Sequence, residues 1–279
     1  MTGTSLINFG EISKPATVLI EKISDALGGY FKPYQIKRVA SAEAEAEIIK
    51  AQTQIDITDL QQRAFIRFIG EEAMKQQNIE QITEKAIIQL TTDSIPEAIE
   101  DDWITNYFDK CRIVSDEEMQ LLWSKVLSGE ANQPGKYSKR TVNYLSSLDK
   151  TDATLFCKLC SFGCFFEEIL PIIHYRDEFY KQNDISFDLL RHLNDIGLIS
   201  FNWVTGFSKI GLPKQIVISY YGTPLNIKFT KETDNVLKIG NILLTQTGEQ
   251  LAGICNSEPI PGFMDYLRDK LTKDGLIVS

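Results

Sequence analysis

The sequence lacks the features of several large protein classes. No apolar run approaches the ~20 residues that a membrane-spanning helix needs, so we do not expect an integral membrane protein. No charged segment followed by an apolar segment marks a secretory signal, and five cysteines are an odd number, which favours reduced thiols. We therefore expect a cytoplasmic protein, with peripheral contact at the inner membrane left open.

Motifs for common enzyme chemistry are also missing. The chain has no Walker loop, no GxGxxG, no HExxH and no GxSxG motif. It has only two histidines, His174 and His192, and neither lies in a recognisable motif. We therefore expect no enzymatic activity, no catalytic residues and no cofactor.

Three cysteines lie close together and raise the question of a metal site. Cys157, Cys160 and Cys164 fall on one face of a predicted helix, but structural zinc needs a fourth ligand, and only His174 or Cys255 is an obvious candidate. Large apolar residues separate the cysteines, as is usual for buried thiols. We expect no bound metal.

Basic residues are fewer than acidic ones. The chain has 29 Lys and Arg against 38 Asp and Glu, a formal charge of -9. This field repels phosphate polymers unless a basic patch is segregated locally. Nucleic acid is therefore possible but disfavoured as a partner.

Proline is absent from Tyr34 to Leu90, and Gly70 is the only glycine in that segment. Strong helix formers dominate it, so it predicts a very long helical segment with a bend near Gly70. A long helix with one apolar stripe needs a partner along its length. We expect an antiparallel helical hairpin or a self-associating arm over residues 1–92. Candidate interface residues are Ile55, Leu60, Phe65, Phe68, Trp103, Trp123 and Arg140, although core packing is the favoured role for both tryptophans.

Two further regions follow the arm. Capping signals at Ser94, Ser115 and Ser138, with Gly129 as a C-cap, predict a helical bundle over residues 93–163. From 164 to 279, the segments FFEEILPIIH and QIVISYYG predict strands. A helix ending in GLISF, a hairpin and LTQTGEQLAGI resemble a winged-helix domain. Its expected recognition helix, SFDLLRHLNDIGL, has too few cations for typical duplex binding.

An amphipathic helix is predicted near the N-terminus. Ser13 is its expected N-cap, Pro15 lies in the first turn, and it closes at Gly28 and Gly29. Core packing is the simplest role for its apolar stripe. Residues 13–31 also allow contact with a membrane surface, although the polar face is not basic.

The segment VSDEEMQLLWSKVLSGEANQPGKYSKRTVNYLSSLDKTDATLF, preceded by EAIEDDWITNYFDKC, resembles the bacterial family known as domain of unknown function 2806. The segments GEISKPATVLIEKISDALGGYFKP and RVASAEAEAE also match that family, so the resemblance extends to about Phe162. The Leu-Leu-Trp helix and LSSLDKTDA are more weakly similar to Abi-alpha type abortive-infection proteins, which implies a role in defence against phage. Neither family supplies catalytic residues.

These observations predict a mainly helical protein with a C-terminal α+β, winged-helix-like domain. We expect a non-enzymatic homo-oligomer that acts by protein–protein interaction, in anti-phage defence and with a protein partner from the same defence system. Two alternatives stay open: a winged-helix regulator that binds nucleic acid, and an effector that disrupts membranes through its N-terminal helix.

Overall fold

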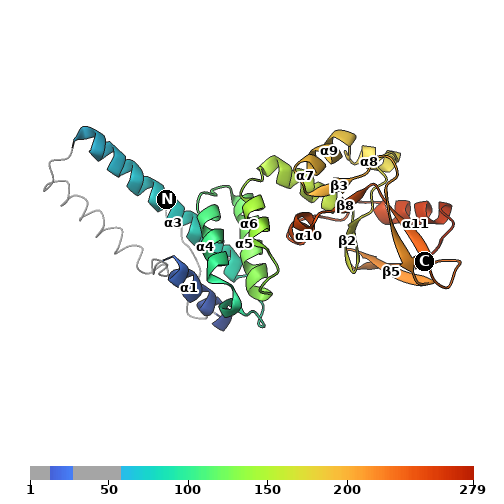
Figure 1. Ribbon diagram of the computed structural model, residues 1–279, viewed down its shortest axis with the longest axis horizontal. Helices are drawn as coiled ribbons and strands as arrows, with labels where there is room; N and C mark the ends of the chain where they lie inside the picture. The colour runs from blue at the N-terminus through green and yellow to red at the C-terminus, as the bar shows by residue number, and fades with distance from the viewer. Residues whose placement is uncertain (1–12, 28–57) are drawn as a thin grey trace. The chain divides into compact units, whose positions relative to one another are not determined.

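The computed structural model describes residues 13–27 and 58–279, and the chain divides into two compact units. The described part of the first unit, Met1–Ser146, is helical, whereas the second, Ser147–Ser279, combines helices with antiparallel strands (Figure 1). The expected mixture of helical and α+β structure is therefore confirmed. The boundaries expected after residues 92 and 163 fall inside these units.

Several described helices of the first unit begin at a side chain that caps the helix. Ser13, Thr58 and Ser138 each accept a hydrogen bond from a backbone N–H of the helix that follows, which confirms the expected N-caps at Ser13 and Ser138. The elements are α1 (Lys14–Ala26), α3 (Asp59–Ile87), the 3-10 helix η2 (Pro96–Ala98), α4 (Asp101–Cys111), α5 (Glu117–Asn132) and α6 (Lys139–Leu145).

Helix α1 uses its apolar stripe inside the unit. Ala16, Leu19, Ile20 and Ile23 are buried, and the helix packs against η2 and α4. The simplest role expected for this stripe, core packing, is therefore what the structure shows. The segment beyond Leu27 lies outside the described residues.

Helix α3 runs through Gly70 without interruption, so the expected division near that glycine is wrong. An added Cβ at Gly70 would meet no atom within 4 Å, which means that no close packing requires a glycine there. The C-terminal half of α3 packs on α5, while its N-terminal half extends beyond α4, α5 and α6 (Figure 1). The rest of the expected arm, before Thr58, lies outside the described residues.

Aromatic side chains fill the core of the helical unit. The rings of Trp103 and Tyr107 stack at 5.1 Å, and Tyr107 meets Trp123 edge to face at 5.2 Å. The Tyr107 hydroxyl donates a hydrogen bond to the Trp123 carbonyl, and the Trp103 indole N–H donates to the Tyr137 carbonyl. These bonds satisfy polar atoms that burial would otherwise leave unpaired.

Several helix ends differ from expectation. The helix expected from Ser94 is split, because η2 ends before α4 begins at Asp101. Asp116, not Ser115, caps α5 by accepting from two backbone N–H groups. Gly129 lies inside α5, where a Cβ would come within 2.7 Å of the Tyr137 ring, so this glycine makes room for a side chain and does not end the helix.

The α+β unit contains a five-stranded antiparallel sheet in the order β2-β1-β5-β6-β9 and two short ladders, β3-β8 and β4-β7. The expected strand FFEEILPIIH folds instead into the β1–β2 hairpin, with Glu167 at a positive φ in the turn. The helices are α7 (Lys150–Cys160), α8 (Glu178–Gln182), α9 (Phe187–Asp195), α10 (Gln246–Ala252) and α11 (Phe263–Lys273). The strands are β1 (Gly163–Phe166), β2 (Glu168–Pro171), β3 (Ile199–Phe201), β4 (Phe207–Leu212), β5 (Gln215–Tyr220), β6 (Thr223–Lys228), β7 (Asn235–Gly240), β8 (Ile242–Leu244) and β9 (Ile277–Val278).

The segment expected to resemble a winged helix has a longer connection than one hairpin. Helix α9 leads into β3, and β3 pairs with β8, with Ile199 opposite Leu244. The β4–β7 and β5–β6 ladders both lie between these two strands in the sequence. Thr245 then caps α10, which lies within the segment LTQTGEQLAGI. The winged-helix description itself stays a prediction.

Candidate functional site

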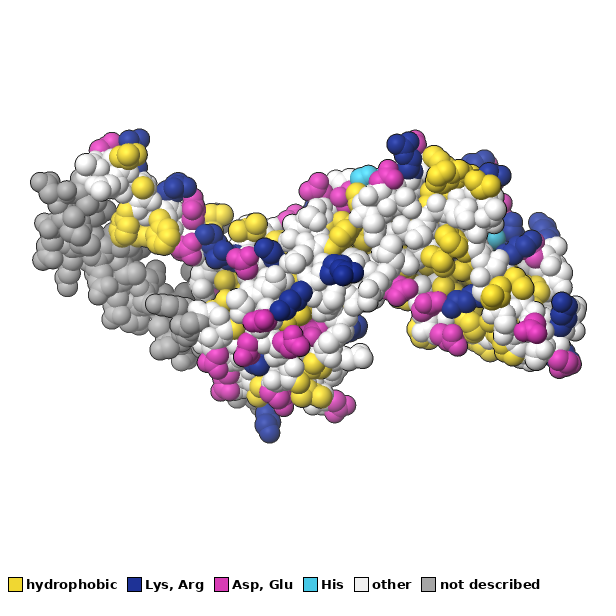
Figure 2. Space-filling model, in the orientation of Figure 1, with side chains coloured by type: hydrophobic (Ala, Val, Ile, Leu, Met, Phe, Trp, Pro, Cys, Tyr) yellow, Lys and Arg dark blue, Asp and Glu magenta, His cyan; other side chains and the backbone are white. Residues whose placement is uncertain are grey.

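The first candidate site is an apolar stripe on the N-terminal half of α3. We call Leu60, Ala64, Phe65 and Phe68 the α3 stripe; all four are exposed, with Leu60 at 69% and Phe68 at 58%. Figure 2 shows hydrophobic side chains gathered over this part of the molecule. Exposure of two phenylalanines and a leucine on one helix is costly in water, so the stripe is a candidate interaction surface.

The α3 stripe continues a face that is already used for packing. Because an α-helix has ~3.6 residues per turn, positions eighteen apart lie five turns apart on the same side. The residues eighteen positions after the stripe are all buried in the helical unit: Asn78, Ile82, Thr83 and Ala86. The sequence therefore repeats one packing face, of which only the C-terminal half is covered.

Polar contacts fix the covered half of this face. The Asn78 side-chain amide donates to the Arg112 carbonyl, and Lys85 Nζ donates to Gln120 Oε1 at 2.6 Å. Gln89 donates to Ser124 Oγ at 3.0 Å. On the exposed half, the positions eighteen residues before Lys85 and Gln89 hold Arg67 and Glu71, which form an ion pair at 3.0 Å.

The expected interface residues lie on different elements and differ in exposure. Leu60, Phe65 and Phe68 share one helix, and Arg140 is exposed on α6, whereas Ile55 lies outside the described residues. Trp103 is 4% exposed and Trp123 is 0% exposed, so both have the core role that was favoured for them, and the interface role is wrong for both. A partner reaches neither ring while this unit is folded. They were selected because tryptophan is common at interfaces, but it is equally suited to cores.

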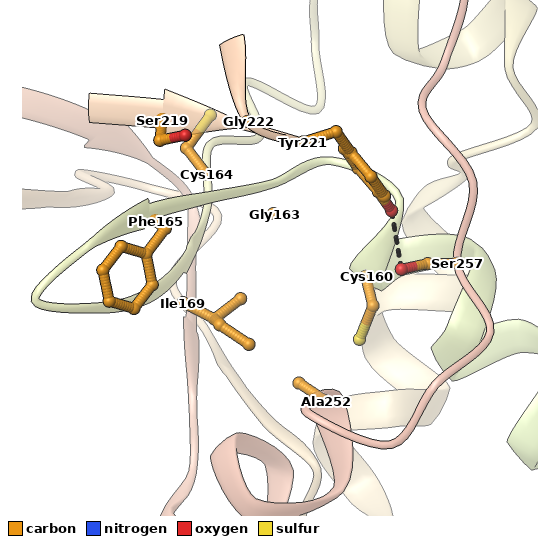
Figure 3. Close-up of a pocket in the computed structure, with 10 residues that line it drawn as sticks. All are labelled: Cys160, Gly163, Cys164, Phe165, Ile169, Ser219, Tyr221, Gly222, Ala252 and Ser257. Carbon is orange, nitrogen blue, oxygen red and sulfur yellow. Dashed lines mark hydrogen bonds between the residues drawn. The ribbon is translucent and has the colours of Figure 1, made fainter. Parts of the chain in front are cut away.

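The second candidate site is a cleft of about 300 Å³ in the α+β unit, named here the Tyr221 cleft. Figure 3 shows its lining residues, which come from α7, the β1–β2 hairpin, the β5–β6 hairpin, α10 and the segment after it. The lining residues are Cys160, Gly163, Cys164, Phe165, Ile169, Ser219, Tyr221, Gly222, Ala252 and Ser257. None of them carries a full charge at neutral pH. Sequence analysis missed this site, except for two of its cysteines, because no local pattern links the five segments.

The polar side of the Tyr221 cleft is a hydrogen-bonded pair of hydroxyls. The Tyr221 hydroxyl donates to Ser257 Oγ at 2.6 Å, and burial raises the pKa of Tyr221. Burial also raises the pKa of Cys164 to about 12, so this thiol stays protonated at neutral pH. A protonated thiol is a poor nucleophile, so Cys164 is not suited to thiolate chemistry.

The expected metal and nucleic-acid features can be placed in the structure. Within residues 13–27 and 58–279, no group of three or more His, Cys, Asp or Glu side chains is arranged to hold a metal ion. On α9, Arg191 lies 3.6 Å from Asp195, and His192 Nε2 lies 2.7 Å from Asp152. Arg191 and His192, the two basic residues of this helix, therefore each have an acidic neighbour. In the described part of the chain, no helix combines the length and the apolar character that crossing a membrane requires.

The geometry defines a two-unit protein with an unpaired helix stripe in one unit and an uncharged cleft in the other. Comparison with family models gives the family: residues 62–268 match the model described as Protein of unknown function (DUF2806), and the chain belongs to this family. The expected resemblance to this family is thus confirmed. No curated protein and no solved structure is significantly similar to the chain.

The extent of the match differs from the expected one. It begins inside α3 and includes most of the α+β unit, whereas the resemblance seen in the sequence ended near Phe162, at the start of that unit. The Tyr221 cleft and three residues of the α3 stripe therefore lie within the matched region. The resemblance to Abi-alpha type proteins stays a prediction.

Proposed function

We propose that this protein is a non-enzymatic, homo-oligomeric interaction protein that associates through the α3 stripe. The observation that carries the proposal is the repeat of the packed face of α3 five turns earlier on its exposed half. Full burial of an exposed Phe or Leu side chain contributes about 1.5–3 kcal/mol. Because Leu60, Phe65 and Phe68 are 69%, 39% and 58% exposed, covering them contributes on the order of 2–5 kcal/mol per copy. This contribution is large enough to offset much of the cost of association.

A second copy of the chain is the occupant that best fits the charges. Over residues 59–77, Asp59, Glu71 and Glu72 balance Arg63, Arg67 and Lys75, so this segment has no net charge although the whole chain has -9. Two such segments do not repel each other, whereas a strongly charged partner gains nothing from this surface. Pairing with another helix is also the way in which the C-terminal half of α3 is covered, by α5.

The test is the mass of the full chain in solution by light scattering. We expect a multiple of 31.6 kDa for the wild type and a shift toward 31.6 kDa for Phe65→Ser combined with Phe68→Ser. Ile66→Ser is the matched control, because Ile66 is also exposed (57%) but points away from the stripe. A wild type that is monomeric at all concentrations rejects the proposal, as does equal loss of mass in the control.

The proposed biological setting is cytoplasmic anti-phage defence in a bacterium, with a protein partner from the same system. Its support is the resemblance of the Leu-Leu-Trp helix and LSSLDKTDA to Abi-alpha type proteins. Plating of a phage panel on cells with and without the gene tests it. Equal plating efficiencies for every phage would remove this setting and leave the proposed self-association untouched.

The two alternatives have less support. Nucleic-acid binding by a winged helix would use α9, whose cations have acidic neighbours. Membrane disruption through residues 13–31 would require α1 to leave the core in which Leu19 and Ile23 are fully buried. Salt-dependent DNA binding would revive the first alternative, and liposome leakage that depends on α1 would revive the second.

A further inference from the structure

We propose that the Tyr221 cleft binds a small, neutral, mainly apolar molecule that carries one hydrogen-bonding group, such as an aromatic alcohol. The site lies wholly within the α+β unit, so this inference goes beyond self-association through α3 and does not depend on it. Its argument rests on the size of the cleft, the chemistry of its lining and the position of Tyr221.

The size of the cleft sets the size of the ligand. The cleft encloses about 300 Å³. One water occupies ~30 Å³ in the liquid, so this volume holds on the order of ten waters or a similar number of non-hydrogen ligand atoms. A cleft of ~300 Å³ lies at the lower end of the range for small-molecule sites, which favours a molecule with a single ring.

The lining sets the polarity of the ligand. Ile169, Ala252 and the exposed ring of Phe165 supply apolar surface, and no lining residue offers an opposite charge to an ion (Figure 3). A charged ligand would lose hydration without gaining a partner. The Ser257 hydroxyl accepts from Tyr221 and still has its own proton to donate, so one polar ligand atom finds a partner beside an apolar floor.

Tyr221 lies at a turn position whose backbone conformation favours other residue types. Tyr221 and Gly222 form the two-residue loop between β5 and β6, with φ values of 47° and 81°. Positive φ at both loop positions is the type I′ turn, which favours Asn, Asp or Gly at the first position. A tyrosine there is strained, and departures from local preference concentrate at functional sites. Here the tyrosine ring forms one wall of the cleft and reaches Ser257 (Figure 3).

The first experiment compares ligands of matched size on the full chain by ligand-observed NMR. The probes are benzyl alcohol, toluene, benzoate and benzylammonium. We expect benzyl alcohol to bind with the highest affinity and both ions to bind at least about tenfold more weakly, since each ion would be desolvated without a partner. Absence of binding by every neutral probe, or equal binding by the ions, would overturn the proposal.

Two variants assign the binding to this cleft. Tyr221→Asn suits the turn and removes the wall, so we expect a folded protein with benzyl alcohol affinity reduced about tenfold or more. Ser257→Ala removes one hydroxyl, so we expect a loss of about fivefold for benzyl alcohol and unchanged binding of toluene. Val217→Asn, on the same hairpin but outside the cleft, is the control. If Tyr221→Asn does not fold, Ser257→Ala decides alone: equal loss for both probes, or no loss for either, refutes the assignment.

Discussion

Replacing Gly248 with alanine tests how α10 packs against Leu198, directly before β3. An added Cβ would lie 2.1 Å from the Leu198 carbonyl oxygen and 3.2 Å from its carbon. That oxygen cannot turn away easily, because it accepts a hydrogen bond from the Thr245 N–H at 3.1 Å. The clash is therefore with fixed backbone, so either α10 or the β3 end must move.

The expected magnitude follows from opposing contributions. Alanine gains up to about 1 kcal/mol of helix propensity over glycine. Overpacking costs about 1–3 kcal/mol, and losing the Thr245 hydrogen bond costs about 1 kcal/mol more. We expect Gly248→Ala to lower the free energy of unfolding of the α+β unit by about 1–3 kcal/mol, with the clash outweighing propensity.

Urea denaturation followed by circular dichroism, with hydrogen exchange of residues 244–252, measures this loss. The matched control is Gly253→Ala at the other end of α10, where φ is -65° and the nearest atom to a new Cβ is Gln250 O at 3.8 Å. We expect the control to be neutral or more stable by about 0.5 kcal/mol. A Gly248→Ala protein as stable as the wild type would refute the packing described for α10.

Two further predictions concern buried ionisable groups. Glu130 accepts hydrogen bonds from the backbone N–H groups of Gly135 and Tyr137. In urea titrations, Glu130→Ala should lower the free energy of unfolding by about 1–3 kcal/mol, and Glu130→Gln should lower it by less. Equal losses for the two variants would contradict this account. Burial, together with Lys270, lowers the pKa of His174, so the unfolded chain takes up this proton near pH ~6.5 and the folded chain only at lower pH. The resulting stability is present above pH ~6.5 and is lost as pH falls below it. His174→Gln should flatten this loss; an unchanged slope would show that His174 does not contribute.

Much of the helical unit was predictable because its signals are local. Ser13 and Ser138 cap helices as their spacing indicated, and the apolar periodicity of α3 marks a packing face without help from the fold. The sequence does not show which of two adjacent residues caps a helix. Asp116 caps α5, while Ser115 accepts a hydrogen bond from the Asn78 side chain. That choice depends on α3, which lies far away in the sequence.

The α+β unit was less predictable because its pairings are distant. Strand β3 pairs with β8 across two intervening ladders, and no local pattern in GLISF indicates which later strand it meets. The Tyr221 cleft was hard to predict for the same reason, since Ile169, Tyr221 and Ser257 lie far apart in the sequence and come together only after folding. The tyrosine in a turn position was the one local signal that was available.

Hydrogen exchange of residues 59–77, measured across a range of protein concentrations, tests self-association through α3 most directly. Backbone amides of an uncovered helix end exchange quickly, and a covering helix slows them. The account predicts that protection of these amides rises with concentration while that of residues 78–87, covered by α5, stays constant. Exchange at one rate at every concentration would mean that no second copy covers the stripe, whether it is bare or covered from within the same chain.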